Sequence, residues 1–163
     1  TTKFVDHNNL DGLDAEDFQR IYGVNVIGCY QMTRAARAAM EANDEGGAVV
    51  NIASTAAVTG IGSSIAYAAS KGAMVTMTMS LARVLGPKIR MNAVCPGFIE
   101  GDWLREGLGD TQYEAVRDAN RRDAPLGVTA CPDTVAKLVK SFGRLCDAAE
   151  SLDDFRYGRK FFK

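Results

Sequence analysis

A tyrosine and a lysine stand four residues apart in the stretch SIAYAASKGA, residues 64 to 73. In a helix this spacing places Tyr67 and Lys71 on one face, with their Cβ atoms about 5 to 6 Å apart. A free phenol has a pKa of about 10, and a neighbouring ammonium group favours its phenolate form. Such a pair can act as a general acid or base near neutral pH. The surrounding alanine, serine and glycine residues are small enough to leave room for a ligand above the ring.

The Tyr67 and Lys71 pair alone is weak evidence, because a packing tyrosine and a solvated lysine give the same spacing. Two further polar residues strengthen the catalytic interpretation. Ser54 follows a short β-prone run at 48–53, and in open α/β sheets ligands bind outside the carboxyl ends of the strands. Asn25 lies on the apolar face of a predicted helix, where a buried amide needs a hydrogen-bond partner. Together the four residues suit proton delivery to a carbonyl oxygen.

The elements that would position these residues alternate between helices and strands. A helix is predicted over 14–42, capped by Asp14, and another over 65–86 that is apolar almost all round and therefore buried on more than one face. Strands are predicted at 48–53 and 88–95. The apolar stripe of the first helix comprises Phe18, Ile21, Cys29, Met32, Ala36 and Met40. Strand, helix and strand in this order predict a right-handed crossover in an α/β, doubly wound parallel-sheet (Rossmann-type) fold that is truncated.

The second half of the chain begins with a long excursion over 98–130, in which a short helix is predicted near 111–122. Loops of this length in compact domains are usually functional or disordered. An amphipathic helix is predicted over 132–146, and the tail 147–163 carries no clear pattern. We interpret residues 1–163 as a single partial Rossmann-type domain with a substrate-loop region and a divergent tail.

Composition excludes several classes of function. The chain of 163 residues has a formal net charge of −1 and an isoelectric point near 5.8, which argues against binding nucleic acid or an anionic membrane surface. Its apolar runs are too short for a membrane span. The four cysteines show no metal-binding spacing and there is one histidine, so no metal site is expected. Reduced thiols suggest a cytoplasmic protein.

Four ordered motifs resemble the classical short-chain dehydrogenase/reductase family. They are Asn25-Val26-Ile27-Gly28, VVNIAS ending in Ser54, Tyr67-Ala-Ala-Ser70-Lys71, and MNAVCPG at 91–97. The resemblance covers roughly residues 10 to 125, and four motifs in order are more specific than any one. It implies an oxidoreductase that uses NAD or NADP and interconverts a small-molecule alcohol and a ketone by hydride transfer.

The resemblance also implies a role for each motif residue. Tyr67 would exchange a proton with the substrate oxygen, and Lys71 would favour the phenolate and contact the nicotinamide ribose. Ser54 would orient the substrate oxygen, and Asn25 would hold a water in the proton relay. The segment beside the nicotinamide would include Pro96, Gly97 and the backbone of Ile99. The helices at 14–42 and 65–86 would form the interface of a homo-oligomer. After the Pro-Gly pair the family places its specificity loop, where Trp103, Leu104 and Leu108 would line a substrate pocket or simply pack.

Three departures from the family pattern accompany this resemblance. First, the chain lacks the glycine-rich phosphate-binding turn, for which Gly60-Ile61-Gly62 is no substitute. Second, Gly101 stands where many relatives carry threonine. Third, the tail lacks the expected last strand. We therefore expect these 163 residues alone to bind NAD(H) or NADP(H) weakly or not at all. The alternative hypothesis is a catalytically inactive truncated relative that acts as an interaction or oligomerisation module. The intact set of four polar residues favours the enzyme, and the missing turn favours the module.

Overall fold

The computed structural model describes the backbone of residues 1–147 and the side chains of residues 1–141. Its sheet consists of two parallel strands, β1 (Gly47–Ile52) and β2 (Ile89–Val94), with Gly47 opposite Ile89 and Ile52 opposite Val94. Helix α4 (Ile65–Leu85) connects them. The predicted strand, helix and strand unit is thus confirmed to within one or two residues at each end. The predicted tail, 147–163, lies almost entirely outside the described residues.

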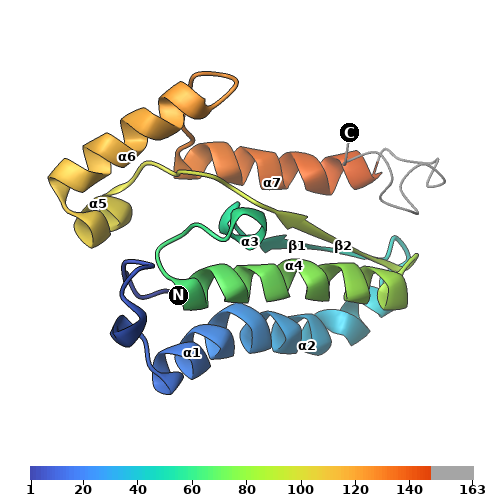
Figure 1. Ribbon diagram of the computed structural model, residues 1–163. Helices are drawn as coiled ribbons and strands as arrows, with labels where there is room; N and C mark the ends of the chain where they lie inside the picture. Colours follow the sequence, from blue (N-terminus) through green and yellow to red (C-terminus); the bar gives the residue numbers. More distant parts are fainter. Residues whose placement is uncertain (148–163) are drawn as a thin grey trace.

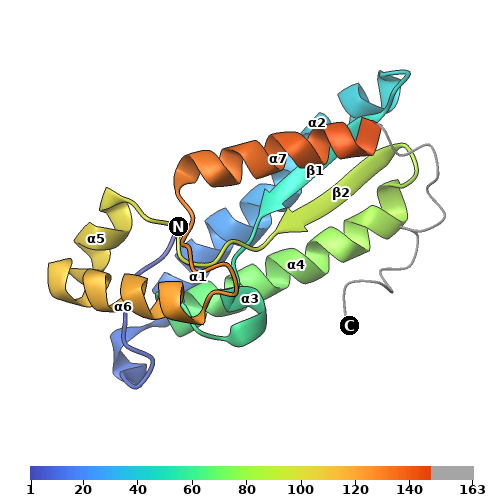
Figure 2. The same ribbon diagram turned by 90° about the horizontal axis from the view of Figure 1, so that it is seen from above.

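Helices cover both faces of this small sheet (Figure 1). Helices α2 (Cys29–Ala42) and α4 lie against one face, and α7 (Pro132–Asp147) lies against the other. Figure 2 shows the two strands and α7 from above, with α4 running beside β2. The arrangement is the layered α/β architecture that the sequence predicts, and it brings the carboxyl ends of both strands to one end of α4.

The long helix predicted over 14–42 is interrupted. Helix α1 (Ala15–Tyr22) is followed by a π-helical segment, Gly23–Gly28, and only then by α2. The start is as predicted, because the Asp14 carboxylate accepts a hydrogen bond from the Asp17 N–H at 2.8 Å. The π turn holds one extra residue, which rotates everything after it by about 100° relative to a continuous α-helix.

The predicted apolar stripe of that helix is therefore only partly correct. Ile21 is fully buried and Cys29 half-buried, but Met32 is 71 % exposed and Phe18 and Ala36 are also exposed. The rotation at the π segment moves the residues of α2 off the face that α1 presents to the core. In addition, two strands cover too little surface to bury a helix of this length.

Helix α4 is buried on more than one face in its first half, as predicted. Its buried residues are small or adaptable: Ala66, Ala68, Ser70, Met74 and Thr78. Towards its C-terminus the helix is less covered, since Met79 and Val84 are exposed. None of the helices in the described part of the chain combines the length and apolarity that a membrane span requires.

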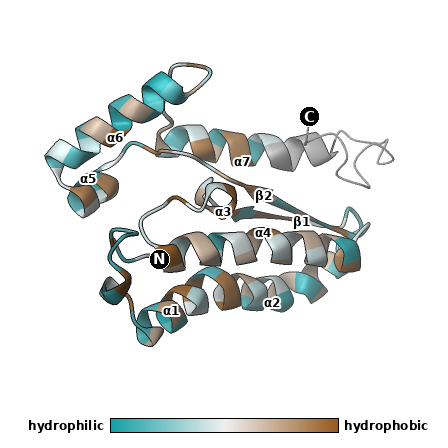
Figure 3. Cartoon of the chain, viewed as in Figure 1, coloured by the Kyte–Doolittle hydropathy of each residue, from teal (hydrophilic) through white to brown (hydrophobic). Residues whose placement is uncertain are grey.

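The excursion after β2 is mainly helical. The predicted short helix is confirmed as α6 (Asp110–Asp123), whereas a second helix, α5 (Asp102–Leu108), was not expected. Gly109 separates them in a left-handed conformation, with φ at 77°. Figure 3 contrasts the largely hydrophilic α6 with the more hydrophobic α4. The remaining short elements are a 3₁₀ turn at Leu10–Gly12 and α3 (Ala56–Thr59).

Candidate active site

Tyr67 lies in the first turn of α4 and is held there by its neighbours. The Tyr67 N–H donates a hydrogen bond of 3.3 Å to the hydroxyl of Ser64, which is fully buried and caps the helix. The loop before the helix closes onto the ring at Gly62, where an added Cβ would lie 3.1 Å from Cδ1 of Tyr67 and 3.0 Å from Cβ of Ala56. A larger residue at 62 would therefore displace the ring or α3.

Lys71 is held between the ring of Tyr67 and the end of β1. Its Nζ lies 5.7 Å from the centroid of the ring and donates a hydrogen bond of 2.7 Å to the carbonyl of Ile52. Burial lowers the pKa of Lys71 below that of an ordinary lysine, while the nearby Cys29 and Cys95 thiols act in the opposite direction. The spacing of four residues thus does bring the ammonium to the phenol, and the strand end fixes it there.

Ser54 lies two residues beyond β1, at the same strand end. Its hydroxyl oxygen accepts a hydrogen bond of 3.2 Å from the Ala56 N–H, so its own hydrogen remains to be donated to another oxygen. On either side the backbone is tied to the neighbouring strand, because Ala53 bonds to Val94 at 2.7 Å and Thr55 bonds to Pro96 at 2.9 Å. Ser54 is therefore half-buried on a fixed backbone.

Asn25 is buried in the π-helical segment, and both polar atoms of its amide are hydrogen-bonded. Its Nδ2 donates 2.9 Å hydrogen bonds to Oγ of Ser70 and to the carbonyl of Thr1, and its Oδ1 accepts one of 2.6 Å from the Thr1 α-amino group. Ser70 in turn donates to the carbonyl of Tyr67 at 2.8 Å. The prediction that this amide needs a hydrogen-bond partner is confirmed, and π segments often occur at functional sites.

Ser70 is a residue whose role the sequence did not indicate. Its residue type and position indicate only a small neighbour of Tyr67, yet it is fully buried and links Asn25 to the turn that carries the tyrosine. Only the distance of three residues from Tyr67 offered a signal, since a serine in a helix can bond back to a carbonyl one turn earlier.

The segment Pro96 to Ile99 runs from the Ser54 end of the sheet towards α5. Gly97 is exposed and faces Thr55, whose Cγ2 would lie 3.9 Å from an added Cβ. Ile99 forms an isolated parallel bridge with Ala130, made by the Glu100 N–H at 2.8 Å and the Phe98 carbonyl at 3.3 Å. The N–H and C=O of Ile99 itself therefore point away from Ala130.

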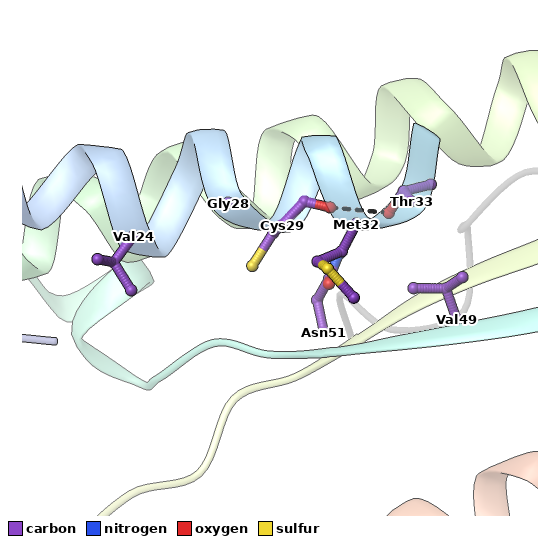
Figure 4. A pocket seen from close by; sticks show the side chains of 7 residues that line it. All are labelled: Val24, Gly28, Cys29, Met32, Thr33, Val49 and Asn51. Atoms are coloured by element: carbon purple, nitrogen blue, oxygen red, sulfur yellow. Dashed lines mark hydrogen bonds between the residues drawn. The ribbon is translucent and has the colours of Figure 1, made fainter. Parts of the chain in front are cut away.

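A hollow of about 420 Å³ lies elsewhere, between α2 and β1 (Figure 4). It is lined by Val24, Gly28, Cys29, Met32, Thr33, Val49 and Asn51. The Asn51 amide donates to Thr78 at 2.8 Å, and the Thr33 hydroxyl donates to the Cys29 carbonyl at 2.9 Å. The hollow contains none of the four predicted catalytic residues, so we place the candidate active site at Tyr67 rather than here.

The geometry therefore brings together most of the predicted site. Tyr67 and Lys71 are adjacent, Lys71 contacts the strand that leads to Ser54, and Asn25 reaches the helix turn of Tyr67 through Ser70. A phenol beside a fixed ammonium, with a hydroxyl donor at the same strand end, can protonate an oxygen and stabilise the anion left behind.

Comparisons with known proteins show the family to which the chain is similar. Residues 2–143 match the family model described as Enoyl-(Acyl carrier protein) reductase. A provisionally named ketoacyl reductase 2 of the granaticin polyketide synthase from Streptomyces violaceoruber is 37 % identical over 138 residues, covering 85 % of this chain and 54 % of the relative. The 2-(S)-hydroxypropyl-CoM dehydrogenase 3 of Xanthobacter autotrophicus is 34 % identical over 128 residues, covering 77 % and 50 %.

Solved structures show the same fold with nicotinamide cofactors bound. ElxO with NADP bound superposes with a TM-score of 0.68 at 28 % identity, covering 81 % of this chain and 52 % of that one. NAD⁺-bound xylitol dehydrogenase gives a TM-score of 0.69 at 26 % identity, covering 80 % and 55 %. The chain spans about half the length of these relatives. It belongs to the classical short-chain dehydrogenase/reductase family.

Proposed function

We propose that the protein of which these residues form the catalytic part is an NAD(P)-dependent oxidoreductase that interconverts an alcohol and a ketone. The observation that carries the proposal is the position of Lys71. Its ammonium lies 5.7 Å from the Tyr67 ring centroid and is anchored to the Ile52 carbonyl. A charge held at this distance can stabilise a phenolate without neutralising it by direct contact.

In the direction of reduction, each residue has a distinct task. The Ser54 hydroxyl donates a hydrogen bond to the substrate carbonyl oxygen, and the Tyr67 hydroxyl gives its proton to that oxygen as the carbonyl carbon is reduced. Lys71 stabilises the phenolate that Tyr67 becomes. Asn25 holds the Tyr67 turn through Ser70 and would hold a water of the proton relay. When bound, the nicotinamide supplies or accepts the hydride.

The residues near the site fit such a cofactor. The N–H and C=O of Ile99 point away from Ala130 and could bond to a carboxamide, while Gly97 leaves space beside Thr55. Lys71 uses one ammonium hydrogen on Ile52 and has two more to donate to ribose hydroxyls. Relatives hold NADP in one case and NAD⁺ in another, so either dinucleotide is included in the proposal.

A test compares two tyrosine variants of the whole protein with a ketone panel and NADH or NADPH. Tyr67→Phe should lower turnover by about 10² to 10⁴, because it removes only the proton donor. Tyr30→Phe, on exposed α2, is the matched control and should keep wild-type turnover. Turnover by Tyr67→Phe at the level of Tyr30→Phe would refute the assignment.

Exposed apolar side chains also support a homo-oligomer whose interface is formed by the helices predicted at 14–42 and 65–86. Apolar side chains are exposed along them, namely Val24, Ile27, Tyr30, Met32, Met79 and Val84. Burying such a surface between subunits would be favourable. Light scattering of the wild type and of Met79→Glu tests this interface, since a charge there should shift the protein towards monomer.

An inactive interaction module remains the second candidate for this chain alone. It is supported by the two-stranded sheet of the described residues, and by similarity to a protein named inactive 2-(S)-hydroxypropyl-CoM dehydrogenase 2, which is 38 % identical over 129 residues and of which this chain covers 54 %. Titration of NADH and NADPH fluorescence with the 163-residue chain separates the two. We expect weak or undetectable binding, and tight saturable binding would rule the module out.

A further inference from the structure

We propose that the site takes a neutral, apolar substrate, whose alcohol or carbonyl group is its only strongly polar part. The substrate body would lie between the loop before α4 and Trp103 on α5. This inference deepens the proposed function and rests on it for the position of the reacting group. The inference is based on two observations around Tyr67: the segments next to it contain few charged residues, and apolar side chains are exposed beside it.

Two of the segments that build the site carry no charged side chain, whereas the part around Asn25 holds the Thr1 α-amino group. Residues 46–70 include β1, Ser54, α3, the loop and Tyr67, and contain no Asp, Glu, Lys or Arg; the same holds for residues 91–99. Lys71 is the first charged residue after that run, and it is bound to Ile52 beside the phenol. A carboxylate or phosphate on the substrate would lose its water here without meeting a new countercharge on these segments, which is unfavourable.

The loop between Ser54 and Tyr67 instead presents apolar side chains to the outside. Val58 is 74 % exposed and Ile61 is 78 % exposed. Ile61 directly precedes Gly62, which touches the Tyr67 ring, so it stands at the rim of the site. Exposed apolar side chains beside a catalytic group are typical of a surface that a ligand covers.

Trp103 on α5 is linked to the loop that carries Ile61 through the N-terminal residues Phe4 and Val5. Its ring lies 5.3 Å from the ring of Phe4, and the next residue, Val5, bonds through its N–H to the carbonyl of Ser63 at 2.8 Å. Phe4 also fills the space at Gly107, where an added Cβ would lie 2.2 Å from its ring. Trp103 is nevertheless 62 % exposed, which leaves a large apolar face for a ligand.

The cations of α5 and α6 do not offset this apolar character. Arg105 is paired with Asp110 and Glu114, Arg117 with Glu114 and Asp118, and Arg121 with Glu100. Each of these three guanidinium groups thus has a carboxylate partner in the protein, and recruiting one to a substrate anion would break that pair. The fourth, Arg122, is exposed in the last turn of α6, at the end away from α5.

The first experiment measures binding through Trp103, the one tryptophan in the sequence. A ketone methyl ester and the corresponding keto acid are titrated into the protein, and the tryptophan emission is followed. We expect the ester to change the emission saturably, with an affinity at least about tenfold higher than that of the acid. Trp103→Phe controls for inner-filter effects, since it should remove the signal.

The second experiment introduces a charge at the rim. Ile61→Lys should reverse the preference, lowering the affinity for the ester several-fold and raising that for the acid, because the ammonium supplies a countercharge. Leu126→Lys is the matched control: it makes the same change at another exposed position, 86 % exposed, in the turn that follows α6. It should leave both affinities unchanged.

These readouts separate the inference from the proposed function. Saturable binding of the ester without turnover would support the apolar site and contradict the reaction. Preferential binding of the acid, no response to either compound, or an Ile61→Lys protein indistinguishable from Leu126→Lys would overturn the inference, whether or not some other ketone is reduced.

Discussion

The two ends of the site are held together by different forces. Around Tyr67 and Asn25 the structure uses buried hydrogen bonds, such as the amide of Asn25 with Ser70 and the cap of Ser64 on Tyr67, and its two ammonium groups bond to neutral oxygens of Asn25 and Ile52 rather than to carboxylates. Around α5 and α6 it uses surface ion pairs and aromatic contacts, such as Arg105 with Glu114 and Phe98 with Tyr113. Buried hydrogen bonds define one geometry, whereas exposed ion pairs tolerate rearrangement.

This difference suits the two tasks that we assign to the regions. Proton transfer requires Tyr67 and Lys71 within a narrow range of distances, and a 1 Å displacement can cost much of the rate. Substrate entry requires α5 to adapt to what is bound. Mutations in the first region should therefore reduce turnover, and mutations in the second should chiefly change substrate affinity and the response to salt.

After Tyr67→Phe, the largest effect is expected for Lys71→Met. Loss of the ammonium removes the charge that stabilises the phenolate, so turnover should fall by about 10² to 10³. Lys71→Arg keeps a charge, although its planar group fits the Ile52 carbonyl differently, and should retain part of the rate. Steady-state kinetics with saturating cofactor measure both. Wild-type turnover by Lys71→Met would contradict the role of the ammonium.

The pH dependence provides an independent check on Lys71. Because burial lowers the pKa of Lys71, the folded protein releases this proton at a lower pH than the unfolded chain does. Between these two pKa values the unfolded state binds more protons, so this group makes the free energy of unfolding rise with pH. Urea unfolding across the alkaline range should show the rise in the wild type and not in Lys71→Met. Turnover should decline through the same lowered pKa, as the ammonium is lost.

A second prediction compares two buried amides, one at the site and one remote from it. Asn25→Ala and Asn51→Ala each remove an amide that is hydrogen-bonded to a buried hydroxyl, on Ser70 and Thr78 respectively. Each should lower the free energy of unfolding by about 1 to 3 kcal/mol. Only Asn25→Ala should also lower turnover, by about tenfold or more, since only Asn25 holds the Tyr67 turn. Equal losses of turnover in the two variants would mean that Asn25 is purely structural.

Much of the first region could be predicted from the sequence, because its signals are local. A continuous β-prone run predicted the first strand, and the stretch between Gly86-Pro87 and Pro96-Gly97 predicted the second. The spacing of four residues placed Lys71 beside Tyr67. The π segment could not be predicted, since six residues of apolar periodicity do not distinguish a π turn from an α turn. This extra residue, together with the small area of the two-stranded sheet, explains why Met32 of the predicted apolar stripe is exposed.

The second region was less predictable, because its contacts join residues far apart in the sequence. Helix α5 has only seven residues and is bounded by Gly101 and Gly109, so it offers less than two turns of periodicity to detect. The contact between Phe4 and Trp103 spans nearly a hundred positions and has no local signature. Aromatic packing and ion pairs of this kind become visible only once the chain has folded.

A third prediction concerns the connection of α6 to the loop after Pro96. The hydroxyl of buried Tyr113 accepts a hydrogen bond of 3.3 Å from the Gly101 N–H, while its ring packs on Phe98. Tyr113→Phe keeps the ring and should lower the free energy of unfolding by about 1 kcal/mol. It should raise KM for the substrate a few-fold and leave kcat nearly unchanged. A fall in kcat without a change in KM would place Tyr113 in the proton-transfer region instead.

The smallest effect is expected for Arg105→Gln, and its response to salt distinguishes the two regions. Arg105 forms ion pairs of 2.9 Å with Asp110 and with Glu114, and its guanidinium carbon lies 4.2 Å from the Tyr113 ring centroid. Salt screens exposed ion pairs but weakens ring stacking much less. The decrease in Tm should therefore be smaller than that of Tyr113→Phe, and should shrink in high salt without vanishing. The decrease caused by Ser70→Ala should be the same at both salt concentrations, because the buried Ser70 hydroxyl bonds to the Asn25 amide and the Tyr67 carbonyl, which carry no net charge to screen. If both variants responded to salt alike, the two regions would not be held by different forces.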